Sequence, residues 1–308
     1  MQGNMLSIVV PLRGTASENW INSLTTVKGP VEFIFVYPPD SSINVIDDPR
    51  IKRLKCPLRG ELIQRLLGLF NATGEYVLCI DDDQYMHPDI MSLTAKYFKL
   101  YPESWVLRLQ KEATQIQENL ENEREWKELP DIHKMPVLTR GDDLSLYEQG
   151  NAILAVPIAP LKNKFDIRSA IWRFFKRRDQ HGWHIENFYQ KVWRNDFVQQ
   201  ALQDLMKTMQ LIGPVKWIPF WTSDRLLGLF IQAKFFKDNT VIGHWLPKPA
   251  QIITTDPGTN RRFRFYGLAD MLLCRKYPQY GYFWNLFFSH LWGFLRMPLG
   301  HLLRKWLG

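Results

Sequence analysis

The stretch Tyr76–Gln84, which reads Y-V-L-C-I-D-D-D-Q, decides the class of fold. Its five apolar or near-apolar residues predict a buried parallel strand, and three carboxylates follow that strand directly. In open α/β sheets, ligands bind in the crevice outside the carboxyl ends of the strands. Because three adjacent acids repel one another, a bound cation stabilises them there. The stretch therefore predicts a divalent cation that carries a phosphorylated ligand; the alternative is a solvated acidic turn.

Apolar segments on both sides of this stretch alternate between strand and helix patterns. Alternation of this kind predicts an α/β protein with a doubly wound, mostly parallel sheet. A long segment, Arg168–Met209, reads as helical. The other predicted strands are Ile8–Leu12, Val31–Tyr37, Ile51–Lys55 and Trp105–Leu109, and the other predicted helices are Glu61–Asn71, Pro88–Leu100 and Arg225–Phe236.

Bulk composition agrees with a globular protein. The chain has 308 residues, of which 45% are hydrophobic, so it can bury a sizeable core. Its three cysteines, Cys56, Cys79 and Cys274, are scattered, which favours a reducing compartment over a disulfide framework. The first apolar segment is short and has no basic residues before it, so no signal peptide is predicted. We expect a cytoplasmic protein.

Most of the net charge of +8 lies at the C-terminal end. Residues 261–308 carry eight basic residues and one acid, Asp270. The apolar run Tyr282–Leu295 is shorter than the ~20 residues that span a bilayer. Aromatic, leucine and basic residues together predict a segment that lies in the interface of an anionic membrane, at its cytoplasmic face. The alternative is a C-terminal helix packed on the body.

These patterns divide the chain into two parts. Residues 1–260 form the predicted catalytic domain, with a polar insertion at 111–136, and residues 261–308 form a basic, aromatic, amphipathic C-terminal extension that associates with the membrane. A basic extension on a near-neutral body indicates a local role. The basic residues accompany an apolar segment and not a recognisable reading helix, so nucleic acid is not an expected partner.

Several motifs resemble glycosyltransferase family 2. The segment Ser7–Pro11 is similar to the family's opening strand, and Phe33–Ser42 looks like its second strand. The segments Arg59–Glu61 and Asn71–Val77 resemble the helix and turn that lead to its D-x-D motif, which Asp81–Asp83 matches. The resemblance covers about the first 90 residues. It implies a Rossmann-like GT-A fold and inverting sugar transfer from a nucleotide-diphosphate sugar.

The resemblance also assigns roles to the acids that follow the strand. Asp83 is expected to contact Mg²⁺ or Mn²⁺ directly, because carboxylates are the hard oxygen ligands that these ions prefer. Asp81 is expected near the ribose or the water shell of the metal. Asp82 is expected either to support these groups or to have no direct role.

Other residues are candidates for binding the donor. Asp40 follows the second strand and is placed to meet the nucleobase or ribose, although it also fits a turn-capping role. Pro11, Arg13 and Arg59 are further candidates, the two arginines as partners of the diphosphate; each arginine also fits an ordinary surface position.

Inverting transfer needs a base for the acceptor hydroxyl. The segment Phe220–Leu227 resembles the family's later motif, and it leaves Asp224 as the candidate base, with helix N-capping as the alternative role. His244 is a candidate further metal ligand or a structural residue. Three tryptophans are candidates for stacking on sugar or for core packing: Trp217, Trp221 and Trp245.

Three classes of function remain open from the sequence. The first is a glycosyltransferase that adds one sugar to a saccharide or lipid-linked acceptor, since the Gln-x-x-Arg-Trp box of processive members is absent. The second is a sugar-1-phosphate nucleotidyltransferase, although Leu12–Ala16 lacks the expected glycine-rich loop. The third is a non-enzymatic adaptor at the membrane surface, for which the acidic triplet would be incidental.

Overall fold

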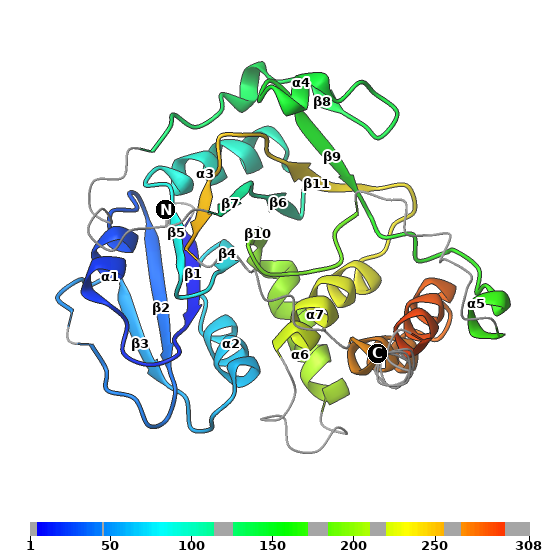
Figure 1. Ribbon diagram of the computed structural model, residues 1–308, viewed down its shortest axis with the longest axis horizontal. Coiled ribbons are helices and arrows are strands. Elements are labelled where there is room, and N and C mark those ends of the chain that lie inside the picture. Colours follow the sequence, from blue (N-terminus) through cyan, green and yellow to red (C-terminus); the bar gives the residue numbers. More distant parts are fainter. Residues whose placement is uncertain are drawn as a thin grey trace, which may run out of the picture.

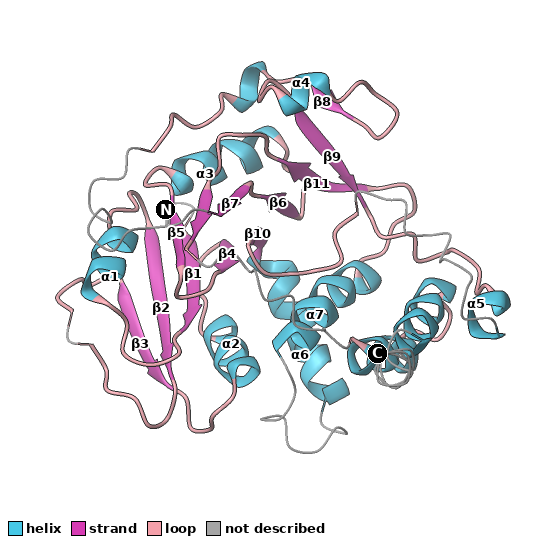
Figure 2. Ribbon diagram, in the orientation of Figure 1, coloured by secondary structure: helices cyan, strands magenta, loops and turns pink. Residues whose placement is uncertain are grey.

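The computed structural model describes residues 5–44, 46–113, 126–171, 184–209, 220–255 and 266–292 (Figure 1). A large central sheet forms the middle layer, and a small sheet lies at one edge of it (Figure 2). The large sheet has nine strands in the order β3 (Ile51–Lys55), β2 (Val31–Tyr37), β1 (Leu6–Pro11), β4 (Tyr76–Cys79), β10 (Lys191–Arg194), β6 (Val106–Arg108), β11 (Val241–Trp245), β9 (Ile153–Pro157) and β8 (Val137–Leu138). The small sheet has the order β5 (Gln84–Met86), β12 (Ile252–Thr254) and β7 (Lys111–Ala113).

The predicted fold class is confirmed. Strands β3, β2, β1 and β4 are all parallel, and β6 is parallel to β11. The sheet is mixed, however, because β10 runs antiparallel between β4 and β6. This arrangement is a Rossmann-like α/β sheet consistent with a GT-A fold. It brings the C-terminal ends of β4 and β6 and the start of β10 to the same edge.

Helices cover both faces of the large sheet. Helices α1 (Glu18–Thr25) and α3 (Ile90–Leu100) pack on one face. Helices α2 (Glu61–Phe70), α6 (Asn195–Met209) and α7 (Phe220–Lys234) pack on the other. Helix α8 (Gly267–Lys276) packs against α7. Three short helical segments lie outside these layers: Ile132–Lys134, α4 (Ser145–Glu148) and α5 (Ile167–Ile171).

Helix α2 lies unusually close to the sheet. Its apolar positions Leu62, Leu66 and Leu69 recur at helical spacing and are buried. A Cβ atom added at Gly68 would lie 2.3 Å from the side chain of Val9, so only glycine permits this approach. The close packing places the N-terminal half of α2 beside the acids that follow β4.

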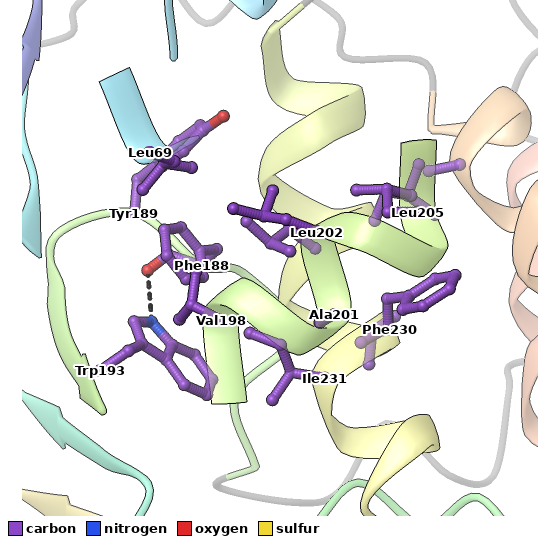
Figure 3. Packing of buried hydrophobic residues seen from close by; sticks show 14 of the residues in the cluster. Leu69, Phe188, Tyr189, Trp193, Val198, Ala201, Leu202, Leu205, Phe230 and Ile231 are labelled. Atoms are coloured by element: carbon purple, nitrogen blue, oxygen red, sulfur yellow. Dashed lines mark hydrogen bonds between the residues drawn. The ribbon is translucent and has the colours of Figure 1, made fainter. Parts of the chain in front are cut away.

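The core on the α2, α6 and α7 face is aromatic and aliphatic (Figure 3). Phe188 and Trp193 stack at 5.4 Å between ring centroids, and the Trp193 Nε1–H donates to the Phe188 carbonyl at 2.8 Å. Both residues are fully buried, as are Leu202 and Phe230 from α6 and α7. Burial of a side chain of this size contributes roughly 1.5–3 kcal/mol. This packing fixes α6 and α7 against β10.

Two sequence predictions are corrected, and one helix was missed. Within the predicted helix Arg168–Met209, residues 191–194 form strand β10, because Val192 and Trp193 pair with both β4 and β6. Helix α1 was not predicted. Helix α7 begins at Phe220 and not at Arg225, so Asp224 lies inside the helix. Residues 172–183 of the first segment and 114–125 of the predicted insertion lie outside the described residues.

The described part of the predicted C-terminal extension packs on the body. Leu272, Tyr282, Phe283 and Leu286 are at most 2% exposed and belong to the same core as α2, α6 and α7. In the described ranges, no helix is both long and apolar enough to cross a membrane. Residues 293–308, with Arg296, Arg304 and Lys305, lie outside the described residues. Association of this segment with a membrane stays a prediction.

Candidate active site

Asp81, Asp82 and Asp83 occupy the tight turn between β4 and β5. The Gln84 side chain closes this turn: its Oε1 accepts from the Asp81 N–H at 3.1 Å, and its Nε2–H donates to Asp81 Oδ2 at 3.2 Å. The end of β12 holds the other side, where the Thr255 N–H donates to the Asp83 carbonyl at 3.1 Å. The three carboxylates therefore stand at the carboxyl edge of the sheet, where ligands of α/β folds bind.

Arg13 joins two of these acids to the end of β1. Its Nε–H donates to Asp82 Oδ1 at 2.7 Å and its backbone N–H donates to Asp82 Oδ2 at 2.9 Å. Its Nη2–H donates to Asp83 Oδ2 at 3.0 Å. The Arg13 side chain is 72% exposed, whereas those of Asp82 and Asp83 are 15% and 20% exposed. Both oxygens of Asp82 are thus occupied, while Asp83 uses one.

Arg65, a residue of α2, contacts the remaining acid of the turn, Asp81. Its side chain, on α2, is 1% exposed and contacts the carboxylates of Asp81 and Glu61. It also donates to Cys79 Sγ at 3.3 Å, and its guanidinium lies 4.1 Å from the centroid of the Tyr189 ring. A buried arginine with several partners is stable only when its charge is compensated. Arg65 therefore ties the acidic turn to α2 and to Tyr189.

Negative charge exceeds positive charge in this cluster. Four carboxylates, those of Glu61 and Asp81–Asp83, share two guanidinium groups. Burial, and then the neighbouring charge of Asp81, raise the pKa of Asp83 above its ordinary value, and burial likewise raises that of Glu61. The excess of two negative charges and the oxygen donor set fit a hard divalent cation. Within the described ranges, no three His, Cys, Asp or Glu side chains already form a metal-binding group.

Asp224 lies on α7, on the same face of the sheet as Arg65. Its side chain is nearly enclosed, with the residue 7% exposed. Its Oδ1 accepts from the backbone N–H groups of Phe188 and Tyr189 at 2.8 and 2.7 Å. These bonds orient the carboxylate and leave Oδ2 outside them.

The electrostatic surroundings of Asp224 favour proton uptake. Burial raises the pKa of its carboxyl, and the charges of Lys191 and Arg65 together with the two backbone N–H groups oppose that rise. Arg65 contacts Asp81 directly and stacks on Tyr189, whose N–H donates to Asp224, so the acidic turn and Asp224 are joined through Arg65 and Tyr189. A buried carboxylate with a raised pKa and one oriented oxygen is suited to accept a proton.

The other residues predicted to bind the nucleotide-sugar lie outside the cluster around the acidic turn. Arg59 and Asp40 pair with each other at 2.5 Å, and their side chains are 74% and 64% exposed. They lie near the ends of α2 and β2 that face the carboxyl edge of the sheet. Pro11 is buried as the last residue of β1 and pairs with Val36, so its ring contributes to packing.

His244 has a structural partner. It lies on β11, is 6% exposed, and its Nδ1 forms a hydrogen bond of 2.8 Å with the Tyr97 hydroxyl. Burial lowers its pKa to about 4, so the ring is neutral. His244 forms no metal-binding group with the acids of the turn. This placement argues against the predicted metal role and supports the structural alternative.

The three tryptophans fall in different places. Trp245 ends β11 and packs against the main core and against Tyr147, at 5.7 Å between ring centroids. Trp217 and the side chain of Trp221 lie outside the described residues.

Sequence reasoning missed Arg65, Tyr189 and Lys191. Arg65 is three residues after Leu62 and four before Leu69, so it lies on the buried stripe of α2, and a basic residue on such a stripe is a usable signal. Tyr189 and Lys191 lay in a segment interpreted as helix. Their alignment with Asp224 depends on the packing of α7 against β10.

Replacing Arg65 with Met is expected to lower the free energy of unfolding by about 3 kcal/mol, because it leaves Asp81 and Glu61 without their buried partner. Urea unfolding followed by circular dichroism measures this change. The control is Lys52→Met at an exposed position of β3, which should change stability by less than about 0.5 kcal/mol. Equal stability of the Arg65 variant and the wild type would show that the guanidinium does not stabilise the turn.

Comparison with known proteins gives structural likeness only. No protein-family model matches the chain, and no curated protein matches it. The crystal structure of S. aureus TarS residues 1–349 aligns with a TM-score of 0.47 and 15% identity, over 88% of this chain and 69% of that chain. The same fragment in complex with UDP-GlcNAc gives a TM-score of 0.46 and 15% identity, over 88% and 66%. A longer TarS chain gives 0.45 and 14%, over 89% of this chain and 43% of that chain. The function is therefore inferred from the geometry of the site.

Proposed function

We propose that the chain is an inverting glycosyltransferase of family 2 that transfers one sugar from a nucleotide-diphosphate sugar to an acceptor hydroxyl. One observation supports this above all. The acidic turn Asp81–Asp83 and the buried Asp224 stand at the same edge of the sheet: the Gln190 N–H donates to the Cys79 carbonyl at the end of β4 at 2.9 Å, and the neighbouring Tyr189 N–H donates to Asp224 Oδ1 at 2.7 Å. The first group suits a leaving diphosphate with its cation, and the second suits an attacking hydroxyl.

On the donor side, Asp83 is our proposed metal ligand. Asp82 has both oxygens bound to Arg13, and Asp81 is bound by Arg65 and Gln84, whereas Asp83 has one oxygen outside these bonds. A bound Mg²⁺ or Mn²⁺ supplies Lewis-acid stabilisation of the diphosphate. Arg13 is exposed enough to contact a phosphate oxygen, and in our proposal the exposed Arg59 is a second contact for the diphosphate and Asp40 contacts the nucleobase or ribose.

On the acceptor side, Asp224 is our proposed base. The backbone N–H groups of Phe188 and Tyr189 fix its Oδ1, which presents Oδ2 to a hydroxyl. The proton of the acceptor hydroxyl passes to this oxygen as the hydroxyl oxygen bonds to the anomeric carbon and the diphosphate leaves. Asp224 is 7% exposed, which limits the access of bulk water that would compete as acceptor.

A screen of nucleotide-sugars with Mn²⁺ or Mg²⁺ tests this proposal. Release of the nucleoside diphosphate together with glycosylation of an added saccharide is the expected result. Formation of a nucleotide-sugar from sugar 1-phosphate and nucleoside triphosphate would instead establish the nucleotidyltransferase alternative. Absence of both reactions would favour the adaptor alternative.

We further propose that the acceptor lies at the cytoplasmic face of a membrane, as a saccharide or lipid-linked glycan. The basic and aromatic composition of residues 293–308 supports this, and so does a groove formed in part by the residues that precede them in the chain. Trp284 and Phe288 line this groove of about 610 Å³ together with Phe165 and two lysines, Lys162 and Lys164.

The membrane proposal predicts that the full chain co-sediments with vesicles that contain anionic lipid. A chain that ends at residue 292 is expected to lose most of this binding, because it lacks Arg296, Arg304 and Lys305, each worth about 1 kcal/mol near an anionic surface. This truncation keeps the buried Tyr282, Phe283 and Leu286. Vesicles of neutral lipid are the control. Equal sedimentation of both chains would contradict the proposal.

A further inference from the structure

Two cations lie side by side beyond the acidic turn. Arg108 is the last residue of β6, and Lys191 is the first residue of the antiparallel β10; the two are direct partners in the strand register. Cross-strand partners project from the same face of a sheet. This is the face that carries Arg65 and Asp224, because Val106 and Trp193, each two residues away along its strand, belong to the core on that face. At this edge of the sheet, carboxylates therefore follow the end of β4, and cations lie at the start of β10 and at the end of β6.

Neither cation has a carboxylate partner within ion-pair distance among the described residues. Lys191 donates to the carbonyl of Tyr189 at 2.9 Å, and the Arg108 guanidinium lies 3.5 Å from the centroid of the Trp245 ring. Burial lowers the pKa of Arg108, and it lowers that of Lys191 to about 8. A half-buried cation without an ion pair is costly to the fold, and Asp224 acts on Lys191 only through its charge. Two such cations side by side would be neutralised by an anion supplied from outside the chain.

The aromatic neighbours of Arg108 add a surface of suitable chemistry. Trp245 packs against the guanidinium, and Tyr147 lies 5.7 Å from Trp245 between ring centroids. The Trp245 Nε1–H is buried and has no acceptor within the described part of the chain. An aromatic face beside hydrogen-bond donors is typical of saccharide sites.

We propose that Arg108 and Lys191 bind an oxyanion, a phosphate or a carboxylate, that the acceptor carries close to the hydroxyl to be glycosylated. This inference rests on the proposed function and names its acceptor class: saccharides that carry a phosphate or a carboxylate. The acids of the turn and their arginines already form the donor side. Lys191 Nζ donates to the Tyr189 carbonyl at 2.9 Å, and the Tyr189 N–H donates to Asp224 Oδ1 at 2.7 Å, so an anion bound to Lys191 lies near the proposed base.

The test uses the full chain without metal or nucleotide and follows the tryptophan indole N–H signals by NMR, with Trp245→Phe to assign the signal of Trp245. Glycerol 3-phosphate, glycerate and glycerol are titrated at constant ionic strength. We expect the two anions, and not glycerol, to shift that signal. The tighter binder of the two identifies the phosphate or the carboxylate as the recognised group.

Arg108→Gln and Lys191→Gln are each expected to weaken anion binding about tenfold or more, because each removes a charge-assisted hydrogen bond. Lys207→Gln on the exposed face of α6 makes the same charge change and should bind as the wild type does. Binding should also weaken as the pH rises through about 8, where Lys191 loses its proton beside Asp224 and Arg108. Thermal unfolding of each variant checks that it is folded. Because the two positions lie on different strands, the two variants test the site independently of each other.

Absence of any shift in the wild type, or equal anion binding by the wild type and both glutamine variants, would overturn the inference. The outcome is separable from that of the proposed function. Anion binding that depends on Arg108, in a chain with no nucleotide-sugar turnover, would retain the oxyanion site and reject the glycosyltransferase. Turnover without anion binding would do the reverse.

Discussion

The Asp224→Asn variant is expected to lose about 10²–10⁴-fold in kcat, which is the usual contribution of a positioned general base. The asparagine Oδ1 can still accept from the N–H groups of Phe188 and Tyr189, so the fold should persist. The amide nitrogen cannot take up the proton of the acceptor. Steady-state kinetics with the best donor from the screen measure the loss, and calorimetry should give unchanged nucleotide affinity.

Asp238→Asn is the matched control, because Asp238 is half exposed, and its side chain contacts Lys162 and the N–H of the neighbouring Asn239 at the surface. Its kcat should equal that of the wild type. If Asp224→Asn keeps full turnover while still folded, the base is a different group, and the acceptor side of the proposed mechanism fails.

The same carboxyl predicts a pH profile. The base must be deprotonated, and burial raises its pKa above the ordinary value, so kcat should fall as the pH falls through that raised pKa. Lys191 is the main group that opposes the rise, with Arg65 and the N–H groups of Tyr189 and Phe188 assisting. Lys191→Gln should therefore move the acid limb of the kcat profile to higher pH. A shift to lower pH would mean that the limb reports another group.

Replacing Asp83 with Asn is expected to remove Mn²⁺ binding and to lower kcat on the order of 10²-fold or more, since a metal that stabilises a leaving diphosphate supplies several kcal/mol. Of the three acids in the turn, Asp83 has an oxygen outside its bonds to Arg13, and its raised pKa reflects burial beside Asp81. Titration of Mn²⁺ followed by electron paramagnetic resonance measures binding independently of turnover.

Asp89→Asn provides the comparison, because Asp89 is 47% exposed and pairs with Lys28 on the surface. It should bind Mn²⁺ and turn over substrate as the wild type does. Undiminished Mn²⁺ affinity in the Asp83 variant would move the metal to another site. Loss of turnover with intact Mn²⁺ binding would leave Asp83 a role in donor binding alone.

Much of the first half of the fold was predictable. The segments Val31–Tyr37 and Ile51–Lys55 are strands with the predicted bounds, and Glu61–Phe70 is the predicted helix. In this region strands and helices follow one another in short, regular alternation along the chain. Local hydrophobic patterns are therefore enough to predict most of the elements. The acidic turn was placed correctly at the end of β4 for the same reason.

The second half was less predictable because its elements pair out of chain order. Strand β10 enters the sheet between β4 and β6, more than 80 residues after the latter. Its four residues lie next to a long helix, so their pattern was absorbed into the helical prediction. Asp224 was identified, but its position inside α7 and its bonds to residues 188 and 189 were not.

The amino-acid sequence by itself determined the α/β class, the order of the first strands and the three carboxylates at the end of Tyr76–Cys79. These follow from hydrophobic periodicity and from adjacent residues, which do not depend on distant contacts. Only the tertiary structure decided that Arg65 serves both Asp81 and Tyr189, that His244 is bonded to Tyr97, and that Arg108 and Lys191 stand as a pair. Each of these contacts joins residues from different elements, so its geometry exists only once the strands have paired in the central sheet and the helices have packed on it.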